Sequence, residues 1–91
     1  MLGYVGKAVK GKEVSVITPE RFSDVEYLIK KFRAREGVIV DFDGIPPHLA
    51  QRMLDFLSGA VFALEGSICK LKYKMYILIP QGVKINTLIK N

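Results

Sequence analysis

The stretch QRMLDFLSGAVFALEGSI, residues 51–68, decides the fold of this chain. At about 100° per residue, its apolar side chains gather on one side of a helix and cover nearly half of the circumference. A helix that packs only on a small sheet needs a narrower apolar side than this. Phe62 also lies in the opposite, polar strip, where a solvated helix normally carries a charged residue. The stretch therefore predicts a helix with two contact surfaces, one for the protein's own sheet and one for a partner.

The second surface of this helix predicts a homodimer or a larger assembly. Gly59 in a helix interior costs about 1 kcal/mol relative to alanine. It follows Ser58 and lies between the bulky Phe56 and Phe62, so another backbone can approach closely there. We assign the following residues to the interface between copies: Met53, Phe56, Leu57, Gly59, Ala60 and Phe62.

Two runs of sequence carry a family signature. The first is DFLSGAVFALEGSI, residues 55–68, and the second is YILIP, residues 76–80. They resemble the SepF family of prokaryotic cell-division proteins, in which a DFLSG run continues with a small residue, valine, an aromatic residue and alanine, and a later strand ends in an aliphatic residue and proline. The resemblance covers the central helix and the hairpin closely, and the order of elements agrees from about Val14 onward.

The resemblance implies an adaptor protein rather than an enzyme. In the SepF family the core domain dimerises, and its helix-hairpin region binds the C-terminal tail peptide of FtsZ, the tubulin-like division GTPase, which is thereby linked to the membrane. For this chain the resemblance implies a cytoplasmic protein at the division site on the inner membrane face, acting in septum formation. Its implied partners are FtsZ and a second copy of the chain, and no cofactor or metal is implied.

Family members attach to the membrane through a short amphipathic helix at the N-terminus. Residues 1–12 match such a helix poorly, because Gly3, Gly6 and Gly11 weaken helix formation. We expect residues 1–12 to be a flexible leader or linker, or a weak edge strand, and residues 13–91 to form the core domain. The resemblance thus implies a membrane contact only through an N-terminal element that is absent or weak in residues 1–12, and whether these residues bind a membrane stays open.

The composition is that of one globular domain. The chain has 91 residues, of which 49% are hydrophobic and 25% are charged, which is enough for a single core. The net charge of +5 suits an acidic peptide, nucleic acid or a membrane surface, and it fits equally a solvated basic surface. A single cysteine, Cys69, excludes an intrachain disulfide and favours a reducing cytosol. No apolar run approaches the roughly 20 residues that span a bilayer.

The pattern of the whole chain predicts an α/β fold with a single mixed β-sheet of four to five strands and two helices. The element order is β-α-β-α-β-β, with a further short strand at the end. The first two strands and the helix between them form a right-handed βαβ unit with parallel strands. The second strand is a nearly continuous apolar run and is expected to be buried on both faces. The predicted strands are residues 13–18, 38–42, 67–72, 75–79 and 83–85.

The ends of the first helix have their own signals. Ser23 and Glu26 have the spacing of a capping box, in which each side chain accepts a backbone N–H of the first turn. Gly37 is expected to close the helix, after a run of lysine and arginine that complements the helix dipole. Ile45-Pro46-Pro47 is expected to be the entry to the second helix, with proline tolerated in its first turn, and the helix is expected to end at Glu65-Gly66.

Catalytic chemistry has little support in the sequence. His48 is the sole histidine and lies in the first turn of the second helix beside two prolines, so it is expected to be a solvated or capping residue. Cys69 is expected to be an inert thiol. Asp41 and Asp43 alternate at a strand end and could hold a cation or act as acid and base, but a solvated turn explains them more simply. We therefore expect no enzymatic activity.

The hairpin at residues 67–79 is the more informative site. Lys70, Lys72 and Lys74 interleave with Tyr73 and Tyr76, and the alternation predicts one wet, cationic strand face. This pattern fits a groove for an acidic, partly apolar peptide or for nucleic acid, and it also fits an edge strand that lysines protect from aggregation. With the family resemblance, we assign the partner-peptide site to Lys70, Lys72, Tyr76 and Ser58. The alternative function is a small basic nucleic-acid-binding domain, although no aromatic stacking motif is present.

Overall fold

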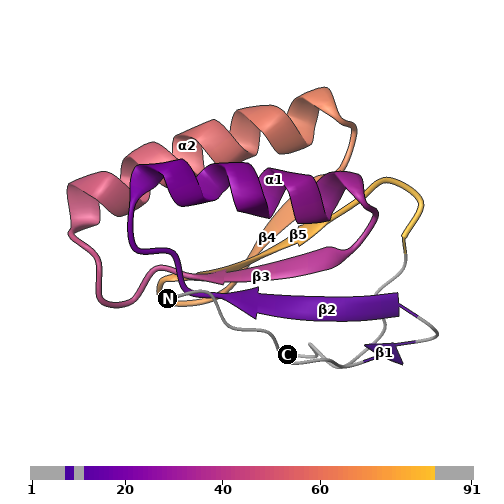
Figure 1. Cartoon of the computed structure of the whole chain (residues 1–91), viewed down its shortest axis with the longest axis horizontal. Coiled ribbons are helices and arrows are strands. Elements are labelled where there is room, and N and C mark those ends of the chain that lie inside the picture. The colour runs from indigo at the N-terminus through magenta and orange to yellow at the C-terminus, as the bar shows by residue number, and fades with distance from the viewer. Residues whose placement is uncertain (1–7, 10–11, 84–91) are drawn as a thin grey trace.

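Five strands form one mixed sheet, and both helices lie on the same face of it (Figure 1). The computed structural model describes residues 8–9 and 12–83. The predicted fold class is confirmed. In chain order the elements are β1 (Ala8–Val9), β2 (Lys12–Ile17), the 3₁₀ helix η1 (Phe22–Asp24), α1 (Val25–Arg33), β3 (Gly37–Asp41), α2 (Pro47–Ala63), β4 (Ser67–Lys72) and β5 (Met75–Ile79).

The strands lie in the order β1-β2-β3-β5-β4. β2 and β3 are parallel and joined by α1, as predicted for a βαβ unit, whereas β5 is antiparallel to both β3 and β4. The extra strand of the sheet is β1, which pairs antiparallel with β2. The strand predicted at residues 83–85 falls largely outside the described residues, and Val83 itself lies beyond the end of β5.

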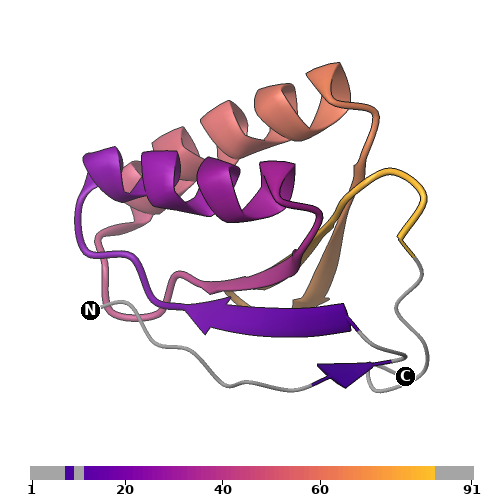
Figure 2. The same cartoon turned by 45° about the vertical axis from the view of Figure 1, so that its right-hand side comes forward.

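The register of the sheet sorts its side chains into two faces. Ile17, Val40, Tyr76 and Lys70 are direct neighbours across four strands, so their side chains point to one face. The helices cover one face of the sheet (Figure 2), and this row lies on that face, because Ile17 and Val40 belong to the buried cluster that also contains residues of both helices. The second face is less deeply buried at β3, where Ile39 is only half-buried. β3 is therefore fully buried only on the face that the helices cover. The expectation that it is buried on both faces is met in part.

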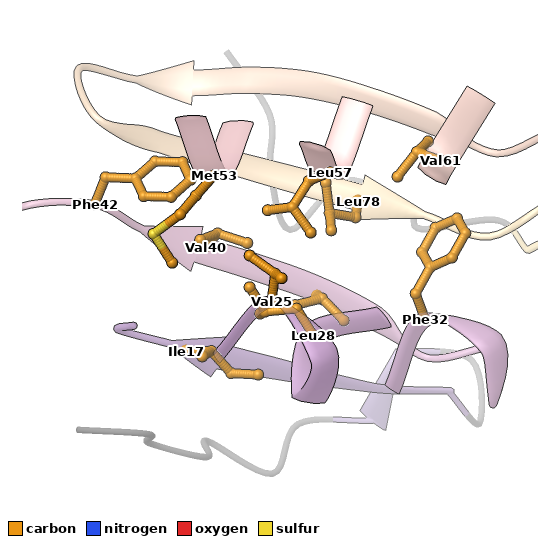
Figure 3. Packing of buried hydrophobic residues seen from close by; sticks show 11 residues of the cluster. Ile17, Val25, Leu28, Phe32, Val40, Phe42, Met53, Leu57, Val61 and Leu78 are labelled. Carbon is orange, nitrogen blue, oxygen red and sulfur yellow. The ribbon is translucent and has the colours of Figure 1, made fainter. Parts of the chain in front are cut away.

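The core lies between the helices and the sheet. α2 contributes Met53, Leu57 and Val61, which recur every fourth residue and all point toward the strands (Figure 3). This spacing places one side chain per turn on the same helix face. The buried cluster consists of Ile17, Val25, Leu28, Phe32, Val38, Val40, Phe42, Met53, Leu57, Val61 and Leu78. A continuous apolar layer of this kind supplies most of the stabilisation of a small domain.

The predicted cap of the first helix is wrong. The chain enters through η1, and α1 begins at Val25. The Asp24 carboxylate accepts the backbone N–H groups of Glu20 at 2.8 Å and of Arg21 at 3.2 Å. Ser23 and Glu26 therefore do not form the predicted capping box: the 3₁₀ turn brings the Asp24 carboxylate back to the two residues that precede η1, and no side-chain hydrogen bond caps the start of α1.

We expect Asp24→Ala to lower the free energy of unfolding by about 1 kcal/mol, because the backbone N–H groups of Glu20 and Arg21 lose the acceptor they have in Asp24. The N–H groups of Glu20 and then Arg21 hold the pKa of Asp24 below its ordinary value. The stabilisation is therefore present above the pKa of the unfolded chain and is lost as the pH falls through the folded value. Urea unfolding should show a difference between wild type and variant at pH 7 that shrinks at acid pH. A difference independent of pH would contradict the assignment.

Both α-helices end on a left-handed residue that is not glycine. Arg35 has φ 68° after α1, and Glu65 has φ 61° after α2. The predicted role of Gly37 as the helix terminator is thus wrong, since Gly37 is the first residue of β3. The predicted end of α2 at Glu65-Gly66 is confirmed, and the N–H of Gly66 donates to the carbonyl of Val61 at 2.9 Å.

Candidate functional site

A pocket of about 160 Å³ lies between the N-terminal half of α2 and the turn end of the β4–β5 hairpin. We call it the α2–hairpin pocket. Its walls come from three parts of the chain: the end of β3, one flank of α2, and the hairpin. The lining residues are Phe42, Pro47, Ala50, Gln51, Leu54, Lys70, Tyr73, Lys74 and Tyr76.

Lys70 and Tyr76, both predicted site residues, meet in this pocket. They face each other across the β4–β5 ladder, so their side chains share the helix-covered face. Tyr76 is half-buried, and its ring meets the buried ring of Phe42 edge to face, with centroids 5.9 Å apart. This contact fixes the orientation of the tyrosine ring, while the Lys70 side chain stays exposed beside it.

Lys72 does not line the α2–hairpin pocket, because the β4 strand is irregular between Lys70 and Lys72. Lys70 pairs with Tyr76, and Lys72 pairs with Met75. Two steps forward along β4 therefore correspond to a single step back along β5. Leu71 is therefore the extra residue of a β-bulge. The bulge turns Lys72 to the open sheet face, in the row of Met75 and Asp41. The prediction that both lysines share one wet face is wrong for this reason.

Ser58 also lies outside the pocket lining. It is half-buried on the same flank of α2 as Leu54, one turn further along. Sequence reasoning missed the helix residues that do line the pocket, which are Pro47, Ala50, Gln51 and Leu54. Their spacing of three and four residues places them on a second flank of the helix. The sequence contained this spacing, but Ala50 and Leu54 were counted as part of the wide apolar side of the helix.

The turn of the hairpin is tied to the end of β3. Lys74 has φ 66°, and its carbonyl accepts the N–H of Phe42 at 2.8 Å. Its Nζ lies 3.8 Å from Oδ1 of Asp43. Asp41 accepts the N–H of Asp43 at 2.9 Å. Both carboxylates therefore take part in the turn contacts, and Lys74 is partly neutralised, which leaves Lys70 as the cation of the pocket without an ion pair among the described residues.

The chemistry of the α2–hairpin pocket is that of a binding site. Phe42, Leu54 and Tyr76 give it an apolar floor, and Lys70 gives it a positive rim. Gln51 donates from Nε2 to Asp55 Oδ1 at 2.8 Å, so its carbonyl oxygen remains available at the rim. A ligand with one apolar side chain and a nearby carboxylate matches this arrangement.

The predicted interface residues of α2 separate into two groups. Met53 and Leu57 have 0% exposure and belong to the protomer's own core, so their assignment to an interface between copies is corrected. On the outer side, Phe62 is 85% exposed and Phe56 is 48% exposed. A Cβ built on Gly59 meets no atom within 4 Å. Phe56, Gly59 and Phe62, with the half-buried Ala60, thus lie on the part of α2 that is turned away from the core, which we call the outer face of α2. Phe56 lies at its α1 edge, where its ring meets that of Phe22 edge to face with centroids 5.9 Å apart.

The residues that were considered for catalysis lie on different elements. His48 is exposed in the first turn of α2, and Cys69 is an exposed free thiol on β4. Among residues 8–9 and 12–83, no group of three or more His, Cys, Asp or Glu side chains could hold a metal ion. No helix in these ranges combines the length and the apolar character that crossing a membrane requires.

Comparison with known proteins gives one consistent result. The family model described as Cell division protein SepF matches residues 14–85. A Cell division protein SepF of Syntrophomonas wolfei is 37% identical over 73 residues, covering 80% of this chain and 51% of that protein. The protein of the same name from Acetivibrio thermocellus is also 37% identical over 73 residues, covering 80% of this chain and 47% of its own length.

A more distant relative extends the match. The Cell division protein SepF of Lactiplantibacillus plantarum is 31% identical over 81 residues, covering 89% of this chain and 57% of that protein. The chain thus spans about half the length of the curated relatives it matches. The similarity includes the whole described sheet from Val14, both α-helices and every residue of the α2–hairpin pocket.

Proposed function

The chain belongs to the SepF family of cell-division proteins, and from this premise we propose that it is an adaptor that binds the C-terminal tail peptide of FtsZ in the α2–hairpin pocket. In this proposal the protein acts as a homodimer and links FtsZ to the cytoplasmic face of the membrane at the division site. It has no catalytic activity of its own. The link to the membrane is not assigned to any described residue.

The observation that carries the proposal is the pairing of Lys70 with Tyr76 at the mouth of an apolar pocket. Tyr76 offers a large, stiff ring with a polar tip, the residue type that recurs at binding hot spots. Lys70 supplies a positive charge for an acidic side chain or a terminal carboxylate. Because the two side chains share one sheet face, a single short peptide can contact both.

The outer face of α2 supports the proposed homodimer. Phe62 at 85% exposure and Phe56 at 48% exposure leave apolar surface in water beside Gly59. Full burial of a phenylalanine side chain is worth about 1.5 to 3 kcal/mol, and a two-fold axis applies that gain twice. The α2–hairpin pocket lies on the other flank of α2, so a second copy on the outer face and a peptide in the pocket use different residues.

Calorimetric titration with an FtsZ tail peptide tests the proposed peptide site. We expect Tyr76→Ala to weaken binding by about 2 kcal/mol, which is roughly 30-fold, because the peptide loses a hot-spot ring. Lys70→Glu should mostly slow association and reduce its salt dependence. The matched control is Lys30→Glu, which makes the same charge change on α1, away from the pocket.

Three results would speak against the proposed site. Equal affinities for wild type and Tyr76→Ala would move the peptide elsewhere. An effect of Lys30→Glu as large as that of Lys70→Glu would mean that only the net charge matters. Binding to nucleic acid with a log-log salt slope near one per phosphate contact, in the absence of peptide binding, would favour the alternative of a basic nucleic-acid-binding domain.

A further inference from the structure

We infer that the acidic partner peptide binds to β4 as an added β-strand, with one side chain in the α2–hairpin pocket. This inference rests on the proposed function and states how that peptide is held. β4 is the last strand of the sheet and pairs only with β5. No other strand in the described part of the chain covers its second side. The backbone N–H and C=O groups of that side are therefore a template for an extended segment.

The exposure of β4 agrees with an open edge. Ser67, Cys69, Lys70 and Lys72 are exposed, and Ile68 and Leu71 are half-buried. By contrast, the neighbouring β5 buries Ile77 and Leu78 to 2% and 0% exposure. A segment that lies along β4 gains main-chain hydrogen bonds on one side and contact with the Leu54 flank of α2 on the other.

The charges of β4 select the occupant. A second copy of the chain that paired β4 with β4 would bring Lys70 and Lys72 close to the same lysines of the other copy. Like charges that face each other across strands are destabilising. An acidic segment reverses the sign of this interaction, so the edge fits an acidic peptide and is protected from self-pairing by the same two residues.

The β-bulge at Leu71 adds a second element of recognition. It places Lys70 on the helix-covered face and Lys72 on the open face of the sheet. In an extended peptide, successive side chains also point to opposite faces. Two adjacent acidic residues of the peptide can therefore pair with one lysine each, which a regular strand with both lysines on one face would not allow. The partner expected here is an extended segment with adjacent carboxylates and an apolar side chain for the pocket.

Amide hydrogen exchange of the full chain, with and without an FtsZ tail peptide, tests the strand addition. The expected result is slower exchange, by about tenfold or more, at alternate β4 amides, because only every second N–H points to the free edge. N-methylation of the peptide, one residue at a time, should weaken binding at alternate positions, by about fivefold at each. Unchanged β4 exchange with a bound peptide would overturn the strand addition and leave the proposed function intact.

Lys72→Glu provides an independent test by calorimetry. Lys72 does not line the α2–hairpin pocket, so a peptide held by the pocket alone should respond to Lys72→Glu as it does to Lys30→Glu. Strand addition predicts that Lys72→Glu weakens binding by about fivefold more than Lys30→Glu does. Equal effects of the two substitutions would overturn the inference. Failure of the wild-type protein to bind the peptide at all would overturn the proposed function itself.

Discussion

Substituting Gly66 with alanine is expected to lower the free energy of unfolding by about 3 kcal/mol, which is a large part of the stability of a domain of this size. A Cβ on Gly66 would lie 2.7 Å from the carbonyl oxygen of Ile79 and closer still to the ring of Phe32. Neither neighbour can move cheaply. The carbonyl oxygen of Ile79 is part of the β5 backbone, and the Phe32 side chain is buried in the core with 2% exposure.

The matched control for Gly66→Ala is Gly59→Ala on the same helix-hairpin segment. A Cβ at Gly59 meets nothing within 4 Å, so this substitution should stabilise the isolated protomer by up to about 1 kcal/mol through helix propensity. Urea unfolding followed by circular dichroism measures both. Equal stabilities of the two variants would contradict the close packing of Gly66 against Phe32 and Ile79.

Substituting Gly59 with lysine is expected to weaken association of the protein by about 100-fold. The reason is that a two-fold interface on the outer face of α2 would place two lysines close together, and like charges at an interface cost several kcal/mol. The fold itself should be unaffected, since the site is open and lysine is a better helix former than glycine. Sedimentation of wild type and variant at micromolar concentration measures the change.

Two controls make the Gly59→Lys result specific. Ala34→Lys adds the same charge at an exposed site after α1 and should leave association unchanged. Circular dichroism should be the same for all three proteins. A wild-type protein that sediments as a monomer, or a Gly59→Lys variant that associates as well as the wild type, would contradict the proposed use of the outer face of α2.

The sequence was sufficient for the architecture because the hydrophobic periods are clear. The β-branched runs before Pro19 and after Gly37 could only be strands, and the wide apolar arc of residues 49–64 could only be a long helix. The residues at which these elements begin and end depend on individual contacts, which hydrophobic periodicity does not report. Asp24, and not Ser23 or Glu26, binds backbone N–H groups at the helix entry because a 3₁₀ turn precedes α1, and Arg35 adopts the left-handed conformation in place of Gly37.

The candidate site was predicted in part for a related reason. Lys70 and Tyr76 were proposed from their residue types and from their positions on adjoining strands, and the ladder places them side by side; that a peptide binds there stays a prediction. Lys72 was misplaced because a one-residue bulge reverses the alternation, and nothing in the local sequence announces a bulge. The width of the α2 arc led to the prediction of two surfaces, but it did not say which residues belong to each, so Met53 and Leu57 were assigned outward although both are fully buried in the core.

The most direct test of the account is chemical-shift mapping of the ¹⁵N-labelled chain during titration with an unlabelled FtsZ tail peptide. We expect the largest shifts on Lys70, Tyr76 and the α2 flank at Gln51 and Leu54. A groove between α1 and α2, which is lined by Glu26, Ile29, Lys30, Arg33 and Phe56, should shift little. Shifts confined to that groove, or no shifts at peptide concentrations that reach millimolar, would contradict the claim that this protein binds the FtsZ tail between α2 and the hairpin.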